Sequence, residues 1–359
     1  MAKSKLAQAL NKALGKNDSI QKVEQWLDTG YPPLNRAISG RYDGGLPAGR
    51  IVEIFGPPSA GKTFLATKAM IAAQRMGGVA AFFDHENSFD VGLAVGMGLD
   101  ADEDEGYWVY KQPNTFEESV ENIGILLNTI RSNELIPADA PIVIVADSLA
   151  SMVPRSKAEK FTKMAEGTAK DKDELNMNDN TALARATSAN FPTLAQWCRQ
   201  YNCLLIVLNQ VRTKLGVMFG DPTTSPGGDS PKFYASVRIR LGASQLKDGK
   251  EKIGQCVGAE VVKNKVAPPF EKCSWNFYYD TGRGLDVVES LVEHMLEDGL
   301  LPKNASGRVE IGDKKYTKSQ IVELYRQKPL EEIVAALAKI DIDKRAKAEA
   351  EKEAAAEAE

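Results

Sequence analysis

A short segment bounded by glycines contains the residues best suited to chemistry in this chain. GPPSAGKT, residues 56–63, directly follows the apolar run IVEIF. Its spacing matches G-x-x-x-x-G-K-[ST], the pattern of loops whose backbone N–H groups surround phosphate oxygens. Lys62 would reach the β- and γ-phosphates of a nucleoside triphosphate, and Thr63 would bind Mg²⁺. Because proline has no N–H, the donors must come from about Ser59 to Thr63. The alternative is an ordinary Gly-Pro turn.

Nucleotide hydrolysis also needs a carboxylate near the metal and a group that activates water. Asp147 ends the run IVIVAD, where its carboxylate could belong to the Mg²⁺ shell. Glu86, just past VAAFFD, is the predicted general base, and Asp84 competes for that role. Either could instead cap the helix that follows. Gln210 ends CLLIVLNQ, where its amide could sense the γ-phosphate or simply cap a chain end.

The segment after Gln210, VRTKLGVMFGDPTTSPGG, combines positive charge with apolar residues among glycines. Residues 211–240 contain five basic and two acidic side chains, which is a local charge of 5 − 2 = +3. Apolar side chains on a glycine-rich loop suit insertion between unstacked bases, while basic side chains bind phosphates. The segment therefore predicts contact with single-stranded nucleic acid. A mobile lid over the nucleotide is the alternative.

The elements that must position these residues alternate between strand and helix. The expected strands of the first part are IVEIF, VAAFFD, IVIVAD and CLLIVLNQ, with helices expected at about 61–76, around 116–130 and around 191–201. Short β-branched runs between such helices predict an α/β fold with a mostly parallel sheet covered on both faces. Ligands in such sheets bind at the carboxyl ends of the strands, where the candidate residues fall. After about residue 232, consecutive strands (FYASVRIRL, VGAEVVKNKV and CSWNFYYD) precede helices and a hairpin in 285–340.

Composition restricts the remaining possibilities. The 359 residues carry a net charge of −4, but residues 349–359 hold five Glu and one Lys, so the rest of the chain sums to zero. A basic surface for nucleic acid therefore remains compatible with the charge. Since no apolar stretch reaches the roughly 20 residues of a membrane span, and the N-terminus lacks a signal-peptide core, a cytoplasmic protein is expected. The four cysteines and two histidines form no metal-ligand pattern, and free, mostly buried thiols are expected.

At this point the residues resemble a known family. GPPSAGKT, FFDHENSFD, IVIVADS, LNQVRTKLGVMFGDPTTSPGGDSPKFYASVR and VVKNKVAPPF occur in the order and spacing of bacterial and phage RecA recombinases, from about residue 30 to 285. The resemblance implies a P-loop RecA-like core at 33–284. An N-terminal helix and oligomerisation segment at 1–32 would pack on the adjacent subunit. A small α/β C-terminal domain at 285–342 and an acidic tail at 343–359 complete the expected organisation.

The resemblance also implies roles for individual residues. Glu86 polarises the attacking water, Gln210 is the γ-phosphate switch, and Lys263 and Lys265 reach a neighbouring protomer's ATP; with Lys62, these form the catalytic set. The lysines' alternative is exposure at a strand end. Thr63 and Asp147 hold the metal. The nucleotide-binding set is Gly56, Pro57, Pro58, Ser59, Ala60, Gly61, Lys62, Thr63, Phe64 and Asp90.

The DNA contacts implied by the resemblance lie in two segments. Residues 211–231 become the second DNA-binding loop, with contacts from Arg212, Lys214, Gly227 and Gly228, and with Leu215 as a wedge between bases. A first DNA loop is expected near 155–180, with Met164 touching DNA, although this segment is longer than the family's. The chain also differs where the family stacks an aromatic ring on adenine, because Leu93 stands near that place.

These expectations describe an ATP-dependent DNA recombinase that forms a filament on single-stranded DNA and exchanges strands with homologous duplex DNA. ATP and Mg²⁺ are the expected cofactors, and no membrane partner is expected. Three alternatives remain open: a related ring-forming DNA helicase, a small-molecule kinase with a glycine-rich lid, and a filament scaffold that binds ATP without turnover.

Overall fold

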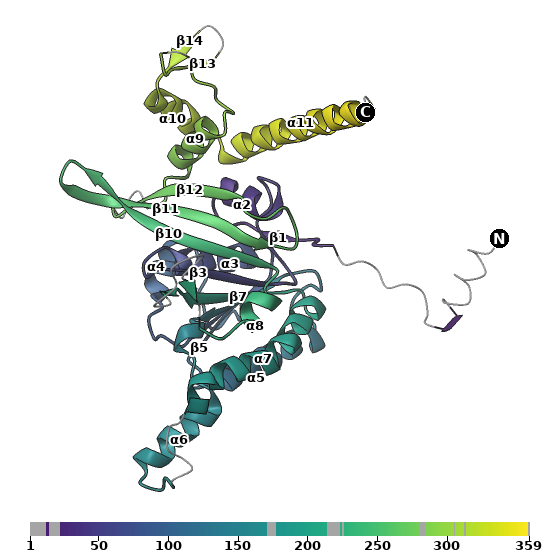
Figure 1. The fold of residues 1–359 in the computed structure, drawn as a ribbon, viewed down its shortest axis with the longest axis vertical. Coiled ribbons are helices and arrows are strands. Elements are labelled where there is room, and N and C mark those ends of the chain that lie inside the picture. Colours follow the sequence, from purple (N-terminus) through teal and green to yellow (C-terminus); the bar gives the residue numbers. More distant parts are fainter. Residues whose placement is uncertain are drawn as a thin grey trace.

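The structure, a computed structural model, describes residues 12–13, 22–170, 177–213, 223–224, 226–280, 284–304, 306–311 and 314–357. An eight-stranded sheet with the order β12-β11-β10-β3-β7-β6-β4-β5 forms its centre (Figure 1). The strands are β3 (Ile51–Gly56), β4 (Val79–Asp84), β5 (Trp108–Lys111), β6 (Ile142–Asp147), β7 (Cys203–Gln210), β10 (Val237–Asp248), β11 (Glu251–Asn264) and β12 (Lys272–Tyr278). All pairings from β10 to β5 are parallel, whereas β10, β11 and β12 pair antiparallel. The predicted α/β fold with a mostly parallel sheet is confirmed.

Helices cover both faces of this sheet, as the apolar runs of the strands require. The helices of the core are α2 (Pro32–Ser39), α3 (Lys62–Arg75), α4 (Val91–Gly96), α5 (Phe116–Ser132), α6 (Arg155–Ala165), α7 (Met177–Gln200) and α8 (Ser230–Tyr234), with a 3-10 turn η1 (Leu149–Ser151). Alternate residues of β3 enter different cores: Val52 and Ile54 pack with α2, α3 and α4, whereas Ile51 packs with α5 and α7. Figure 1 shows these two layers on either side of the sheet.

One local expectation was wrong. The run FYASVRIRL was expected to be one strand, but Phe233 and Tyr234 end helix α8 and β10 begins only at Val237. Pro231 in the first turn explains the difference, because its fixed φ favours a helix start. The segment expected to be the first DNA loop contains helix α6 and the start of α7, which extend away from the sheet in Figure 1. The Ala, Lys and Glu residues of α6 favour helix over loop.

The remaining described elements form a smaller unit beside β12. They are the helices α9 (Val287–Glu297), α10 (Lys318–Arg326) and α11 (Leu330–Glu357), with the hairpin of β13 (Val309–Ile311) and β14 (Lys314–Tyr316). Two small apolar clusters hold this unit together, and one of them includes Tyr42 of the core. Helix α11 continues through residue 343, where the acidic tail was expected to begin. Among the helices of the described ranges, none is long and apolar enough to cross a membrane.

Two short two-stranded pairs complete the core. Strands β1 (Trp26–Leu27) and β2 (Leu46–Pro47) pair beside α2, and β8 (Arg212–Thr213) pairs with β9 (Thr223–Thr224) beyond β7. The β8 and β9 pair is antiparallel, so residues 223–224 of the segment 211–231 lie beside residues 212–213, directly after β7. This places the roots of that segment next to the carboxyl end of β7.

A buried ion pair connects the three strands at the centre of the sheet. The fully buried carboxylate of Glu53 on β3 accepts hydrogen bonds from Arg238 Nε on β10 (2.6 Å) and Asn209 Nδ2 on β7 (3.0 Å). Such a pair contributes little over an apolar substitute, but removing one partner leaves a buried charge without compensation. The ion pair therefore couples strand register to stability.

We expect Glu53→Ala to lower the free energy of unfolding by about 3–5 kcal/mol, because Arg238 would lose its buried counter-ion. Urea denaturation followed by circular dichroism measures this change. The matched control is Glu260→Ala, which breaks a pair with the exposed Lys272 and should cost less than about 1 kcal/mol. Equal effects of the two substitutions would contradict the account.

Candidate active site at the carboxyl ends of the strands

The loop between β3 and α3 has the shape that its glycines predict. At Gly56, a Cβ atom would lie 2.4 Å from the carbonyl oxygen of Leu241, so a side chain is excluded there. Gly61 adopts a left-handed conformation, with φ of 86°, immediately before α3 begins at Lys62. The first N–H groups of α3 therefore point toward the loop, where an anion would be stabilised. This arrangement supports the expected phosphate site.

Lys62 folds back over the same loop. Its Nζ donates hydrogen bonds to the carbonyl oxygens of Gly56 (3.2 Å) and Pro57 (2.8 Å). Burial lowers the pKa of Lys62, and the carboxylates of Asp147 and Glu86 oppose this shift. Phosphate oxygens can replace the two carbonyl acceptors with stronger, charge-assisted bonds. Lys62 is therefore held within reach of the site that the loop encloses.

Thr63 and Asp147 lie together on the other side of the loop. Thr63 Oγ1 donates a hydrogen bond to Asp147 Oδ2 at 3.2 Å. Burial, followed by repulsion from Glu86, raises the pKa of Asp147 to about 7. A divalent cation would stabilise the charged form of such a carboxylate. Since hydroxyl and carboxylate oxygens are suitable Mg²⁺ ligands, these two residues fit the expected metal.

Three side chains hold the carboxylate of Glu86 beside the loop of residues 56–63, which we call the phosphate loop. Its Oε1 accepts hydrogen bonds from Gln210 Nε2 (2.9 Å), from Ser151 Oγ (3.1 Å) and from Ser148 Oγ. The donors come from the ends of β7, η1 and β6, respectively. One carboxylate oxygen therefore joins three separate elements at the carboxyl edge of the sheet.

Asp84, the competing candidate for the base, is occupied within its own turn. The buried carboxylate accepts hydrogen bonds from the backbone N–H groups of Glu86, Ser88 and Phe89 and from the hydroxyl of Tyr110, at 2.9–3.0 Å. Asp84 thus fixes the shape of the turn after β4. Glu86 is the carboxylate of this turn that faces Ser148, Ser151 and Gln210.

The roots of the predicted second DNA-binding loop lie next to this network. Asn209 Nδ2 donates to the carbonyl oxygen of Pro226 (3.2 Å), and Thr187 Oγ1 donates to that of Gly227 (2.8 Å). Gly227 and Gly228 are left-handed, and a Cβ at Gly227 would lie 2.5 Å from Leu149 Cδ2. Both ends of the loop therefore depend on residues adjacent to the Glu86 network. Lys214 and Leu215 lie outside the described residues, as does the side chain of Arg212.

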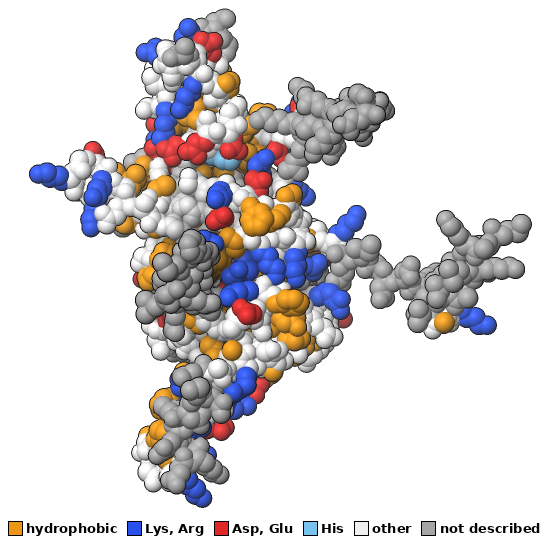
Figure 2. Space-filling model, viewed as in Figure 1, with side chains coloured by type: hydrophobic (Ala, Val, Ile, Leu, Met, Phe, Trp, Pro, Cys, Tyr) orange, Lys and Arg blue, Asp and Glu red, His pale blue; other side chains and the backbone are white. Residues whose placement is uncertain are grey.

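Lys263 and Lys265 lie together at the end of β11, against helix α8. Lys263 Nζ donates to the carbonyl oxygens of Lys232 (2.6 Å) and Phe233 (2.7 Å), and Lys265 Nζ donates to that of Phe233 (3.3 Å). Burial, with repulsion from Lys265 and Arg238, lowers the pKa of Lys263 to about 8. Figure 2 shows basic side chains gathered in the middle of this face, near α8. These lysines form a separate site from the Glu86 network.

Asp90 and Leu93 lie at the start of helix α4, and Met164 lies near the end of α6. The carboxylate of Asp90 caps α4 by accepting a hydrogen bond from Leu93 N (2.9 Å), and the Leu93 side chain is 66% exposed. Met164 is 36% exposed near the end of α6. The position of Met164 on a helix was not anticipated from the sequence.

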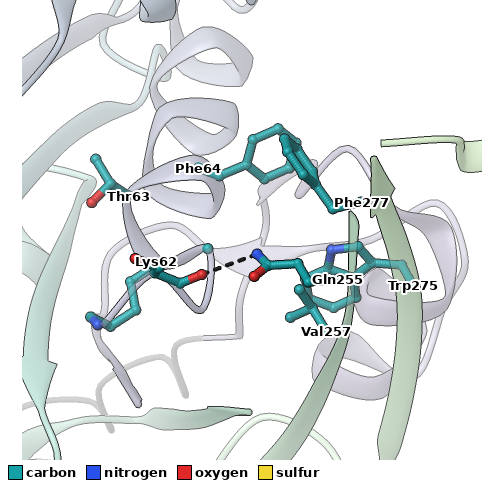
Figure 3. A pocket seen from close by; sticks show the side chains of 9 residues that line it. Lys62, Thr63, Phe64, Gln255, Val257, Trp275 and Phe277 are labelled. Atoms are coloured by element: carbon teal, nitrogen blue, oxygen red, sulfur yellow. Dashed lines mark hydrogen bonds between the residues drawn. The ribbon is translucent and has the colours of Figure 1, made fainter. Parts of the chain in front are cut away.

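An apolar cavity beside the phosphate loop includes residues that sequence reasoning missed. Its volume is about 250 Å³, and Phe64, Val257, Trp275 and Phe277 line it with Gln255. Figure 3 shows Phe64 and Phe277 next to each other at one side of the cavity, with ring centroids 5.5 Å apart in an edge-to-face arrangement, whereas Lys62 points away from the cavity. Gln255 Nε2 donates to the carbonyl oxygen of Ser59 (3.0 Å). Only the pairing of β11 and β12 brings these residues here, so no local motif could have identified them.

The chain is similar to several known proteins. Residues 5–284 match the family model described as the RecA N-terminal domain. The chain is 37% identical over 293 residues to Protein RecA of Bacteroides thetaiotaomicron, covering 81% of this chain and 78% of the relative. It is also 37% identical over 341 residues to Protein RecA of Thermus thermophilus, covering 91% and 90%. A solved structure described as the RadB recombinase matches with a TM-score of 0.47 and 22% identity, covering 72% of this chain and 98% of that chain.

The raised pKa of Asp147 predicts how stability without nucleotide depends on pH. Because the folded pKa of about 7 exceeds the ordinary value of 3.8, the native state becomes less stable as pH rises between these values. At pH 8 we expect Asp147→Asn to raise the free energy of unfolding by an amount on the order of 1 kcal/mol or more. The melting temperature should therefore rise as well. At pH 4 the two proteins should differ little. Thermal melts at both pH values test this, and a destabilised variant at pH 8 would contradict it.

Proposed function

The chain belongs to the RecA family, and from this premise we propose that it is an ATP-dependent DNA recombinase. It assembles as a filament on single-stranded DNA, pairs this DNA with homologous duplex and exchanges the strands. The observation that carries the proposal is the hydrogen bond between Gln210 Nε2 and Glu86 Oε1. This bond connects Glu86, in the candidate nucleotide site, to Gln210, the residue that directly precedes the predicted DNA-binding loop. A cytoplasmic location accords with this function.

The chain's own residues account for ATP hydrolysis. Backbone N–H groups from about Ser59 to Thr63 bind the phosphates, and Lys62 binds their outer oxygens. Thr63 and Asp147 would hold Mg²⁺, which neutralises phosphate charge when bound. Glu86 orients the attacking water and accepts its proton, as a carboxylate beside the terminal phosphate can do. The base of ATP packs on the apolar cavity beside Phe64.

Gln210 provides the connection between nucleotide and DNA. In this structure its amide donates to Glu86, at a distance of 2.9 Å. A γ-phosphate offers a second, more strongly charged acceptor, so its arrival draws the amide away from Glu86. That movement frees the base and shifts the root of the loop 211–231. ATP then stabilises the DNA-binding state because it binds this state more tightly.

The loop 211–231 supplies the DNA contacts. Arg212, Lys214 and the backbone of Gly227 and Gly228 bind phosphates, and Leu215 enters between bases. Since phosphate contacts release counter-ions, DNA binding should weaken as salt rises. Met164 on α6 adds a contact from the other DNA-binding segment. After hydrolysis the loop loses its nucleotide-dependent position, and DNA is released.

Assembly of protomers completes the ATP site. Lys263 and Lys265 bind carbonyl oxygens of α8 in the single protomer, and they exchange these for a neighbour's ATP in the filament. Burial, and after it the positive charges of Lys265 and Arg238, lower the pKa of Lys263. An adjacent triphosphate would favour the charged form of this lysine. The N-terminal segment packs on the adjacent protomer.

We expect Lys62→Ala to abolish both ATP hydrolysis and strand exchange, because a phosphate contact and a positive charge are lost together. Hydrolysis is measured by phosphate release, and exchange by transfer of a labelled strand from homologous duplex. The control is Arg75→Ala, at the far end of α3, which should retain both activities. Hydrolysis by Lys62→Ala at the wild-type rate would mean that the phosphate site is misassigned. The helicase alternative would be favoured by two results together. The wild type would hydrolyse ATP without exchanging strands, and electron micrographs would show closed rings rather than filaments.

We expect the double substitution Lys263→Ala and Lys265→Ala to lower DNA-stimulated hydrolysis at least about tenfold, because each ATP loses its cationic partners from the next protomer. The melting temperature of the protomer should change little. The matched control is Lys272→Ala, an exposed lysine on the neighbouring strand β12. An unchanged rate of DNA-stimulated hydrolysis would remove the role across protomers.

A further inference from the structure

The turn that carries Glu86 must be placed accurately, and its internal bonds do not achieve this. Asp84 holds the backbone of residues 86, 88 and 89 and so gives the turn a fixed shape. Those bonds lie within the turn and at the end of β4, from which it starts. They leave open how the turn is oriented relative to the phosphate loop. Contacts with neighbouring elements must determine that orientation.

His85, the residue before Glu86, makes two contacts with neighbouring elements. Its backbone N–H donates to the carbonyl oxygen of Asp147 (2.6 Å), which connects the turn to the end of β6. Its ring Nε2 forms a hydrogen bond of 2.6 Å with Ser119 Oγ, which connects the turn to α5. The Ser119 side chain is buried, with 2% exposure, in the second turn of that helix. His85 thus joins the turn to both a strand and a helix of the core.

The two neighbouring side chains point to different elements. Glu86 reaches Ser148, Ser151 and Gln210 at the ends of β6, η1 and β7. His85 reaches α5, which packs on the sheet through an apolar face of its own. Since the two residues share one peptide bond, a rotation of the turn that breaks the His85 contact also moves the carboxylate of Glu86. Such a displacement need not disturb the apolar core.

We propose that His85, through its hydrogen bond to Ser119, is a positioning residue that holds the general base Glu86 in place for ATP hydrolysis. The inference rests on the proposed function, in which Glu86 activates water. The His85 ring lies outside the hydrogen bonds of the Glu86 carboxylate and acts through the backbone. A misplacement of a catalytic group by about 1 Å can lower a rate about 100-fold.

The experiment compares His85→Ala, His85→Gln and Ser119→Ala with the wild-type full chain on single-stranded DNA. Burial lowers the pKa of His85, so the ring is neutral near pH 7 and the neutral amide of glutamine is the appropriate mimic of Nε2. The matched control is Ser88→Ala in the same turn, because only the backbone N–H of Ser88 bonds to Asp84. The measurements are kcat, the Kd for ATP and the urea midpoint of unfolding.

We expect His85→Ala and Ser119→Ala each to lower kcat by about 10- to 100-fold, with the Kd for ATP within about twofold of the wild type. His85→Gln should recover most of the rate that His85→Ala loses. The double variant, His85→Ala with Ser119→Ala, should be no slower than either single variant, because the two side chains act as a unit. Ser88→Ala should behave as the wild type. If His85→Ala does not fold, Ser119→Ala and His85→Gln decide the question.

An unchanged kcat in Ser119→Ala, additive losses in the double variant, or no recovery with glutamine would overturn the positioning role. A loss of ATP binding that matches the loss of kcat would also overturn it. Glu86→Gln separates the two proposals. If that variant hydrolyses ATP normally, the assignment of Glu86 as base fails. If it is inactive while His85→Ala is normal, only the role of His85 fails.

Discussion

The hydrogen bond from Gln210 to Glu86 is the interaction on which the rest of the site depends. It joins the end of β7 to the turn after β4, although β6 lies between these strands in the sheet. Ser148 and Ser151 donate to the same oxygen atom. The ends of β6, η1 and β7 and the turn after β4 therefore meet at one carboxylate. A change at any of them, including the arrival of a phosphate, therefore reaches the others. The predicted DNA-binding loop begins at the next residue, so it cannot be independent of this carboxylate.

The parallel sheet explains why these residues meet. The strands β3, β7, β6 and β4 run in the same direction, so their carboxyl ends lie along one edge. Gln210 and Asp147 are the last residues of β7 and β6, and the phosphate loop and Glu86 come directly after β3 and β4. The buried pair of Glu53 and Arg238 fixes the register of the central strands just below this edge. Stability and catalysis consequently depend on the same strand register.

The strands and the polar residues at their ends could be predicted from the sequence, whereas the contacts between distant segments could not. Strand runs that end in Gly56, Asp147 and Gln210 could be recognised because the apolar pattern and the terminal polar residue are adjacent in the chain. The cavity formed with Phe277 and Gln255 could not, since strands β11 and β12 meet α3 only through tertiary pairing. The helix at residues 155–165 agrees with the helix propensity of these residues. It was not predicted because the segment was expected to contain a DNA-binding loop. Ser151 gave no signal beyond its type, because its role depends on the turn of η1.

In the proposed mechanism, ATP is sensed through Gln210 and used by Glu86, and in this way it controls the DNA-binding loop. The most direct measurement is the rate of ATP hydrolysis with and without single-stranded DNA, at two salt concentrations, for the wild type and Glu86→Gln. We expect DNA to stimulate hydrolysis by the wild type strongly, high salt to weaken this stimulation, and Glu86→Gln to bind ATP and DNA without turnover. A wild-type rate that ignores DNA would contradict it and would make the segment 211–231 a lid over the nucleotide.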